Sequence, residues 1–179
     1  MGEGGSVSGT EVSFRQNMGF LSDYLEGLNI SGNYMNFNSE AQQDYNKRGD
    51  NRWNAEDDRP QELLYRPLGW IDSTYNITFS YDITNKLSTR YNINKQSEVA
   101  HGNRNNGEYG LRIPTSIHSL SLRYKNGNYT IFGQVGNITD EFTRDAQLAL
   151  EFFEAPLKNT LRQQDTLGIS YYVGMNYRF

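Results

Sequence analysis

The chain has 179 residues, with 17 glycines, 4 prolines, no cysteine, 13% aromatic residues and a formal charge of −4. The lack of cysteine excludes disulfides, thiolate catalysis and cysteine-ligated metal sites, and an acidic balance without a basic stripe argues against a nucleic-acid partner. The mean hydropathy of −0.78 is strongly polar, yet such an aromatic content does not suit a disordered chain. The chain contains no run of about 18 apolar residues, so no transmembrane helix is predicted. A membrane β-barrel with a wet interior, however, needs only half of each strand to be apolar.

Seven stretches alternate apolar and polar residues, which is the pattern of a β-strand. In chain order they are residues 11–20, 28–37, 70–83, 87–94, 118–124, 129–135 and 167–179. Most exceed the usual length of about five or six residues and suit a tilted crossing of a bilayer. We expect the apolar positions to face lipid and the polar positions to face a water-filled lumen. The expected lipid-facing residues are Ile71, Tyr75, Ile77, Phe79 and Tyr81, and the expected lumen-facing residues are Asp72, Asn76, Arg90, Arg123 and Arg178. We expect the arginines and acids inside the lumen to pair across the strands.

The connections between these stretches alternate strictly between short and long. Short, turn-forming connections rich in Asp, Asn and Gly follow the first, third and fifth stretches. Long connections follow the second, fourth and sixth, at about residues 39–68, 99–112 and 140–166. Outer-membrane barrels have short periplasmic turns and longer extracellular loops, so the pattern predicts an antiparallel up-and-down barrel segment with its short turns in the periplasm.

Aromatic residues gather where the chain would cross a membrane interface. Rings with a wet edge prefer the headgroup level, and seven lie beside a short turn or the C-terminus: Phe20, Tyr24, Tyr81, Tyr124, Tyr129, Tyr177 and Phe179. Trp70 lies at the other end of its strand. Within the long loops, Trp53, Tyr65 and Tyr109 are candidate contacts for a ligand. Residues 143–159 have a helix-like apolar density, which fits either a short loop helix or loop packing.

The C-terminal stretch also carries a motif. The segment YVGMNYRF, Tyr172 to Phe179, resembles the assembly signal at the end of bacterial outer-membrane barrels, through Tyr172, Gly174, Tyr177 and Phe179. The resemblance implies that the barrel-assembly machinery reads this strand as an edge that awaits a partner. In that role Gly174 would let the strand bend and Phe179 would anchor it.

Two further segments resemble TonB-dependent outer-membrane receptors of the proteobacterial type: GGSVSGTEVSFRQNMGFLSDYLEGLNISGNY, Gly4–Tyr34, and GQVGNITDEF, Gly133–Phe142. The resemblance implies a barrel of about 22 strands, a plug domain, contact with the TonB complex and energised uptake of a scarce nutrient such as siderophore-bound iron, an oligosaccharide or a vitamin. The chain departs from the family pattern because residues 1–179 show no signal peptide and no plug. We therefore expect it to be the C-terminal portion of such a barrel, about seven strands, in the outer membrane of a Gram-negative bacterium.

No catalytic motif is present: the sequence has no G-x-S-x-G, no H-E-x-x-H and no P-loop. We expect no enzyme activity, no cofactor and no metal site. Two alternatives stay open. One is a small outer-membrane pore or adhesin, whose eighth strand would come from residues 62–66 or 148–153. The other is a soluble β-sandwich that binds carbohydrate.

Overall fold

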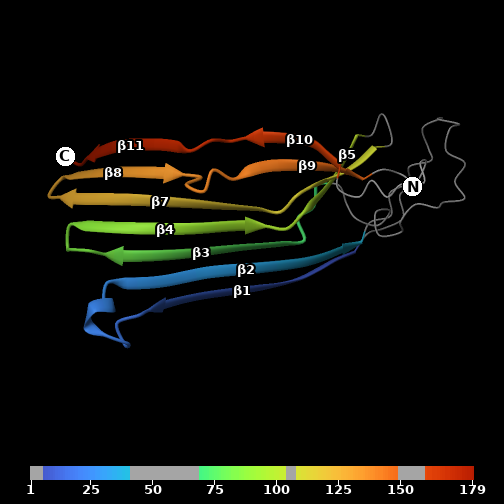
Figure 1. Cartoon of the computed structure of the whole chain (residues 1–179). Coiled ribbons are helices and arrows are strands. Elements are labelled where there is room, and N and C mark those ends of the chain that lie inside the picture. The colour runs from blue at the N-terminus through green and yellow to red at the C-terminus, as the bar shows by residue number, and fades with distance from the viewer. Residues whose placement is uncertain (1–5, 41–68, 104–107, 149–159) are drawn as a thin grey trace, which may run out of the picture.

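The computed structural model of the chain describes residues 6–40, 69–103, 108–148 and 160–179. Seven long antiparallel strands lie side by side in one sheet, in the order β1-β2-β3-β4-β7-β8-β11 (Figure 1). Their bounds are β1 (Ser6–Asn17), β2 (Leu28–Glu40), β3 (Ser73–Asp82), β4 (Leu87–Gln96), β7 (Thr115–Asn126), β8 (Tyr129–Gly136) and β11 (Ser170–Tyr177). The seven strands predicted from alternation are therefore confirmed.

A second sheet of four shorter strands extends the last four long strands beyond their loop end. It contains β5 (Val99–Asn103), β6 (Glu108–Arg112), β9 (Phe142–Leu148) and β10 (Thr160–Thr166) in the order β10-β9-β6-β5. This order repeats that of β11, β8, β7 and β4, because each short strand lies next in sequence to one of those long strands. The loop hairpins thus continue the up-and-down arrangement, which the sequence did not predict. The prediction of a loop helix that begins near Thr143 is wrong, since Phe142–Leu148 is a strand.

The seven-stranded sheet is not closed. β1 pairs only with β2, and β11 pairs only with β8, so both outer strands have a free edge within the described part of the chain. The prediction of an all-β, antiparallel, up-and-down sheet is confirmed, whereas closure and barrel size stay predictions. Residues 62–66 and nearly all of 148–153, the candidates for an eighth strand, lie outside the described residues.

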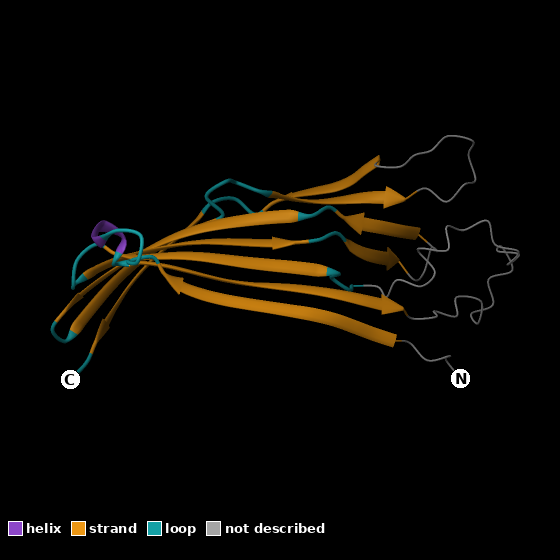
Figure 2. Cartoon of the chain, turned by 90° about the horizontal axis from the view of Figure 1, so that it is seen from below, coloured by secondary structure: helices purple, strands orange, loops and turns teal. Residues whose placement is uncertain are grey.

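The three short connections lie at one end of the sheet, together with the C-terminus (Figures 1 and 2). The β1–β2 turn contains a single 3-10 turn, Asp23–Leu25, capped by the Ser22 hydroxyl, which accepts from the Tyr24 N–H. The β3–β4 turn is held by Thr84, whose hydroxyl oxygen accepts from the Leu87 N–H at 3.0 Å. The β7–β8 turn is made by Gly127, whose φ of 57° favours glycine. The predicted alternation of short and long connections is confirmed.

Almost no hydrophobic core exists among the described residues. The only buried hydrophobic residue there is Ala146, at 5% exposure. Large apolar side chains of the long strands are exposed to solvent, among them Tyr171, Val173 and Met175, with exposed fractions of 75%, 79% and 66%. A soluble sandwich would cover such side chains with a second sheet packed face to face, and no described element does so.

A tight turn built on Asn137 connects β8 to β9. Asn137 is 6% exposed and has a φ of 53°. Its amide nitrogen donates to the carbonyl oxygens of Glu141 at 3.1 Å and Gly168 at 3.2 Å, and its amide oxygen accepts from the Glu141 N–H at 2.9 Å. Because Gly168 lies two residues before β11, this one side chain ties the β8–β9 turn to the segment that leads into the last strand.

Candidate functional site

The register of the seven strands sorts their side chains onto two faces, because directly opposed residues in an antiparallel pair point the same way. Phe79 lies opposite Ile30 and Tyr91, and Ile77 lies opposite Ile93. We call this side the apolar face; its residues include Phe14, Ile30, Tyr75, Ile77, Phe79, Tyr81, Tyr91, Ile93, Leu120, Leu122, Val135 and Val173. Four of the five expected lipid-facing residues lie here. The fifth, Ile71, precedes β3 and forms an isolated bridge with Val99.

Aromatic residues border the apolar face at both ends. At the turn end, the ring of Tyr177 lies 5.9 Å from that of Tyr129 and 5.0 Å from that of Phe179. At the loop end, Tyr34 pairs with Tyr75 across β2 and β3, and the Lys95 ammonium lies 5.8 Å from the centre of the Tyr75 ring. A lysine that reaches past an apolar surface to a polar boundary is typical of interfacial side chains. The role of Lys95 was not predicted, because its partner depends on the register between β3 and β4.

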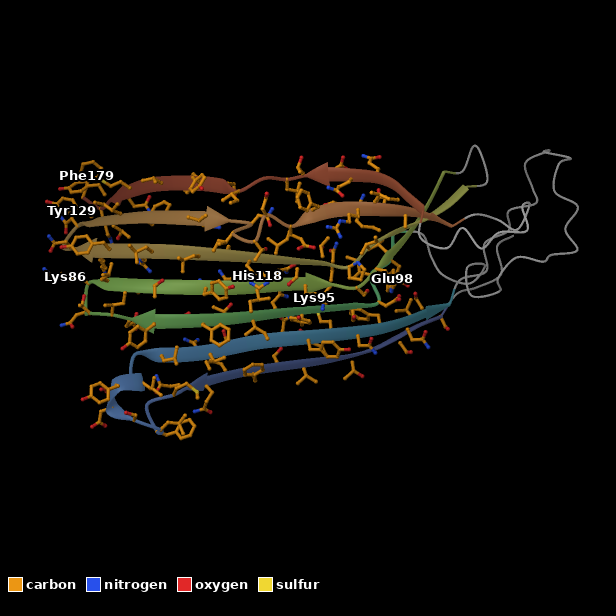
Figure 3. All side chains as sticks on the ribbon, in the orientation of Figure 1. Lys86, Lys95, Glu98, His118, Tyr129 and Phe179 are labelled. Carbon is orange, nitrogen blue, oxygen red and sulfur yellow. The ribbon has the colours of Figure 1, made fainter. Side chains whose placement is uncertain are left out.

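The height of the apolar face can be followed along β7. From Tyr124 near the turn end to Ser116, which pairs with Lys95, the strand runs for roughly 27 Å at ~3.4 Å per residue. At the strand tilt of about 40° usual in outer-membrane barrels, this length would correspond to a height of roughly 20 Å, and the apolar band of such barrels is ~25 Å tall. Figure 3 shows the same span, with Tyr129 and Phe179 at the turn end, Lys95 and Glu98 toward the loop end, and His118 between them.

His118 is a polar residue on the apolar face, and both ring nitrogens have partners. Its Nδ1 lies 2.6 Å from the Tyr91 hydroxyl, and its Nε2 lies 3.1 Å from the Ser116 hydroxyl. Buried or lipid-exposed polar groups are costly unless they are hydrogen-bonded. Local pairing of all three side chains therefore lets a histidine occupy this position, and no catalytic carboxylate is required to explain it.

The opposite side, which we call the polar face, carries a ladder of amide and hydroxyl groups. The Asn76 amide donates to the Asn33 side-chain oxygen at 3.1 Å and accepts from the Asn94 amide. Next to it, the Thr78 hydroxyl donates to the Asn92 side-chain oxygen at 2.8 Å. The polar face includes Ser31, Asn33, Asn76, Thr78, Ser80, Arg90, Asn92, Asn94, Ser119, Ser121 and Arg123.

The expected lumen-facing arginines do not pair with acids across the strands. Arg90 lies opposite Ser80 and Ser121, and Arg123 lies opposite Ser88 and Phe132. Arg178 follows β11, and Asp72 precedes β3, where its carbonyl oxygen accepts from the Phe37 N–H. The ion pair found within the described ranges joins Arg112 and Asp145 and lies on the four-stranded sheet. The ladder of neutral side chains, not charge pairing, links the strands on this face.

The residues of the expected assembly signal divide between the two faces. Tyr172 and Gly174 share the polar face with Phe132, whose ring lies 5.7 Å from that of Tyr172. Gly174 lies opposite Phe132, and a Cβ added to it would meet the ring at 2.5 Å. We expected this glycine to let the strand bend; in the structure it makes room for an aromatic ring across the strand pair. Tyr177 lies on the apolar face beside Phe179.

Replacing Gly174 by alanine is expected to destabilise the sheet by about 1 kcal/mol, because the new methyl group would push Phe132 away from Tyr172. The matched control is Gly133→Ala, where the nearest heavy atom to a Cβ is 3.9 Å away and no loss is expected. The free energy of unfolding by urea, measured for the whole chain in detergent micelles, compares the two. Equal effects would mean that Phe132 does not need the space above Gly174.

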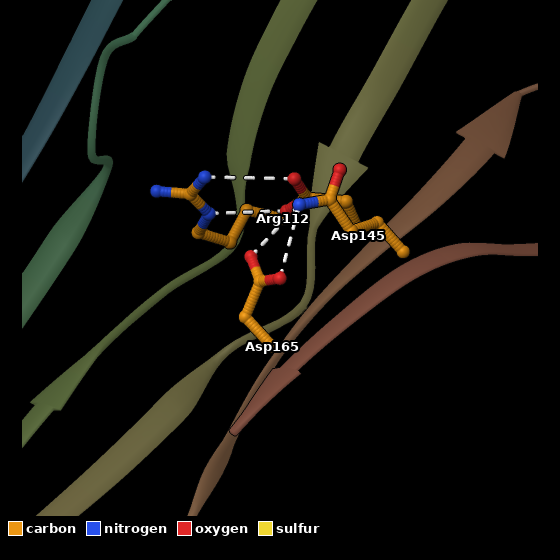
Figure 4. A network of polar contacts seen from close by, with 4 residues as sticks. Arg112, Asp145 and Asp165 are labelled. Carbon is orange, nitrogen blue, oxygen red and sulfur yellow. Dashed lines mark hydrogen bonds and ion pairs between the residues drawn. The ribbon is translucent and has the colours of Figure 1, made fainter. Parts of the chain in front are cut away.

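The four-stranded sheet contains a polar network of its own (Figure 4). The Arg112 guanidinium on β6 donates to both carboxylate oxygens of Asp145 on β9, with its Nε 3.0 Å from Oδ1. On β10, the Gln163 amide donates to the Asp165 carboxylate at 2.9 and 3.0 Å. Asp145 is 9% exposed, so this pair fixes β6 against β9 at the base of the extension.

The expected loop contacts are not tested. Trp53 and Tyr65 lie outside the described residues, and Tyr109 is placed only as a backbone position in β6. The described ranges contain no group of three or more His, Cys, Asp or Glu residues that could hold a metal ion. They also contain no helix long and apolar enough to cross a membrane.

Comparison of the chain with family models, curated proteins and solved structures gave no match.

Proposed function

We propose that the chain is the C-terminal part of the barrel of a TonB-dependent outer-membrane receptor, which takes up a scarce nutrient such as siderophore-bound iron, an oligosaccharide or a vitamin. The observation that carries the proposal is the exposed apolar face, bordered by aromatic residues at both ends. Leaving that face in water would cost about 25 cal/mol for each Å² of apolar surface. Outer-membrane lipid removes this cost, whereas the hydrogen-bonded polar face opposite suits a water-filled lumen.

The two free edges support a larger barrel. Unpaired backbone groups of β1 and β11 would be costly in hydrocarbon, where no water can satisfy them. The remaining strands of a parent barrel would pair with both edges and close the sheet. In that arrangement the short turns face the periplasm and the four-stranded sheet projects outward, where loops contact the nutrient. The TonB complex would engage the protein through a part other than residues 1–179.

Assembly in cells tests this proposal through Phe179. Deleting Phe179 from the protein expressed from its own gene should remove it from the outer-membrane fraction, because the assembly machinery would lose its C-terminal aromatic contact. Asn176→Ala, a change near the end of the same strand but outside the expected signal, should leave the amount in that fraction unchanged. Equal amounts of the deletion and wild-type proteins in the outer membrane would contradict the proposed assembly role.

Uptake tests the transport role. Disrupting the gene should abolish accumulation of one labelled nutrient among a ferric siderophore, an oligosaccharide and a vitamin. Removing the proton gradient, which energises TonB, should have the same effect on wild-type cells. Unchanged uptake of all three classes after disruption would contradict a receptor for these nutrients.

A further inference from the structure

A hollow of about 570 Å³ opens at the turn end of the sheet, between the β7–β8 turn and the end of β11. Its polar lining comes from Arg123 and Lys125 of β7, Thr130 of β8, and Asn176 and Arg178 at the end of the chain. Small-molecule sites typically measure about 300–1,000 Å³. The hollow therefore has the size of a site for a small solute.

The charge of this hollow is one-sided. The side chains of Arg123, Lys125 and Arg178 line it, and none of its lining residues is Asp or Glu. None of Arg123, Lys125 and Arg178 has an ion-pair partner within the described part of the chain. A neighbouring hollow of about 730 Å³ shares Arg123 and Lys125 but is also lined by Asp23, Glu26 and Asp82. No Asp or Glu side chain lines the first hollow, whereas three line its neighbour.

The backbone fixes where these cations can reach. Lys125 on β7 pairs with Thr130 on β8, and Thr130 pairs with Asn176 on β11. The Thr130 hydroxyl and the Asn176 amide therefore lie between the cations of β7 and Arg178. On the far side, the Arg178 N–H donates to the Asn128 carbonyl oxygen at 2.9 Å, which holds the segment after β11 against the β7–β8 turn. Cationic donors therefore approach the hollow from β7 and from the segment after β11, with neutral donors on β8 and β11 between them.

We propose that this hollow binds the phosphate group of a small water-soluble solute. Two guanidinium groups and one ammonium group supply charge-assisted hydrogen bonds to phosphate oxygens, and the Thr130 hydroxyl and Asn176 amide supply neutral ones. A soluble solute fits better than a lipid, because Arg123, Lys125 and Thr130 lie on the polar face, opposite the exposed apolar side chains. The site is formed by the β7–β8 hairpin and the end of β11 alone, and it does not require the receptor function proposed above.

Titration of the full 179-residue chain in non-ionic detergent with inorganic phosphate, at constant ionic strength, tests the site by calorimetry. Saturable binding is expected for the wild type. The double variant Arg123→Gln/Arg178→Gln should weaken it at least about tenfold, since each lost charge-assisted bond contributes more than a neutral one. Lys95→Gln, which removes a cation from the opposite face, should bind as the wild type does.

Absence of saturable phosphate binding by the wild type would overturn the proposal, as would equal weakening by Lys95→Gln. Saturable binding of phosphatidylglycerol added to the micelles, without saturable binding of inorganic phosphate, would also overturn it in favour of a lipid headgroup. A second measurement needs no variant: phosphate should shift the side-chain Nε–H resonances of Arg123 and Arg178 in the wild-type chain and leave that of Arg15 in place. Shifts of all three together would indicate unspecific screening and contradict the site.

Discussion

Phe79→Arg is expected to lower the free energy of folding into lipid vesicles by about 2–4 kcal/mol, the range for a cation placed at mid-depth on the outer surface of a membrane barrel. Phe79 lies near the middle of the apolar face, two residues from Tyr81 at the turn end and four from Tyr75 at the loop end. It pairs with Ile30 and Tyr91, and its ring lies 6.5 Å from that of Tyr91. Urea titration of the vesicle-inserted chain measures the loss.

The matched control is Thr78→Arg, one residue away and on the polar face. There the new cation would lie in water between Ser31 and Asn92, at the cost of one hydrogen bond to Asn92. We expect a loss of about 1 kcal/mol. Similar losses for the two variants would mean that both faces lie in the same environment and would contradict the assignment of lipid to one of them.

Asn137→Ala is expected to cost about 2–4 kcal/mol, from two sources. The substitution removes the three hydrogen bonds that a nearly buried amide makes to Glu141 and Gly168, and each unsatisfied buried group costs about 1–3 kcal/mol. It also places alanine at a φ of 53°, a left-handed conformation that disfavours residues with a Cβ. Urea unfolding in detergent micelles gives the change in free energy.

Two further variants separate these sources. Asn137→Gly tolerates the backbone conformation and should recover about 1 kcal/mol relative to alanine, while the hydrogen bonds stay lost. Thr139→Ala, at an exposed position in the same turn, should change stability by less than about 0.5 kcal/mol. If Asn137→Ala were as mild as Thr139→Ala, the tie between the β8–β9 turn and the start of β11 would not contribute to stability.

The long strands could be predicted because alternation is a local property of the sequence. Residues 75–81 alternate so regularly that strand, faces and the neighbouring turn follow from the sequence alone, and the structure places these residues in β3 accordingly. The four-stranded sheet could not be predicted in this way. Residues 143–159 as a whole have a helix-like apolar density, and pairing with β6 and β10 makes their first part, within Phe142–Leu148, a strand.

The polar face illustrates a second limit. That Asn76 and Asn94 point away from the apolar face follows from their parity, but the amide ladder depends on the register between β2, β3 and β4, which no single strand encodes. We expected arginines to pair with acids, although Arg90 and Arg123 lie opposite serines in the observed register. Asn137 stood out only as part of a sequence motif, because its partner Gly168 is 31 residues away.

The most direct test of the membrane-spanning sheet is a scan of single cysteines through residues 75–81, carried by the chain in lipid vesicles and read by spin-label accessibility to oxygen and to a water-soluble nickel complex. The chain contains no cysteine, so each label reports one position. Labels at Ile77 and Phe79 should be accessible to oxygen, and labels at Asn76 and Thr78 to nickel, in strict alternation. Equal accessibility to nickel at all four positions would place both faces in water and contradict a membrane-spanning sheet.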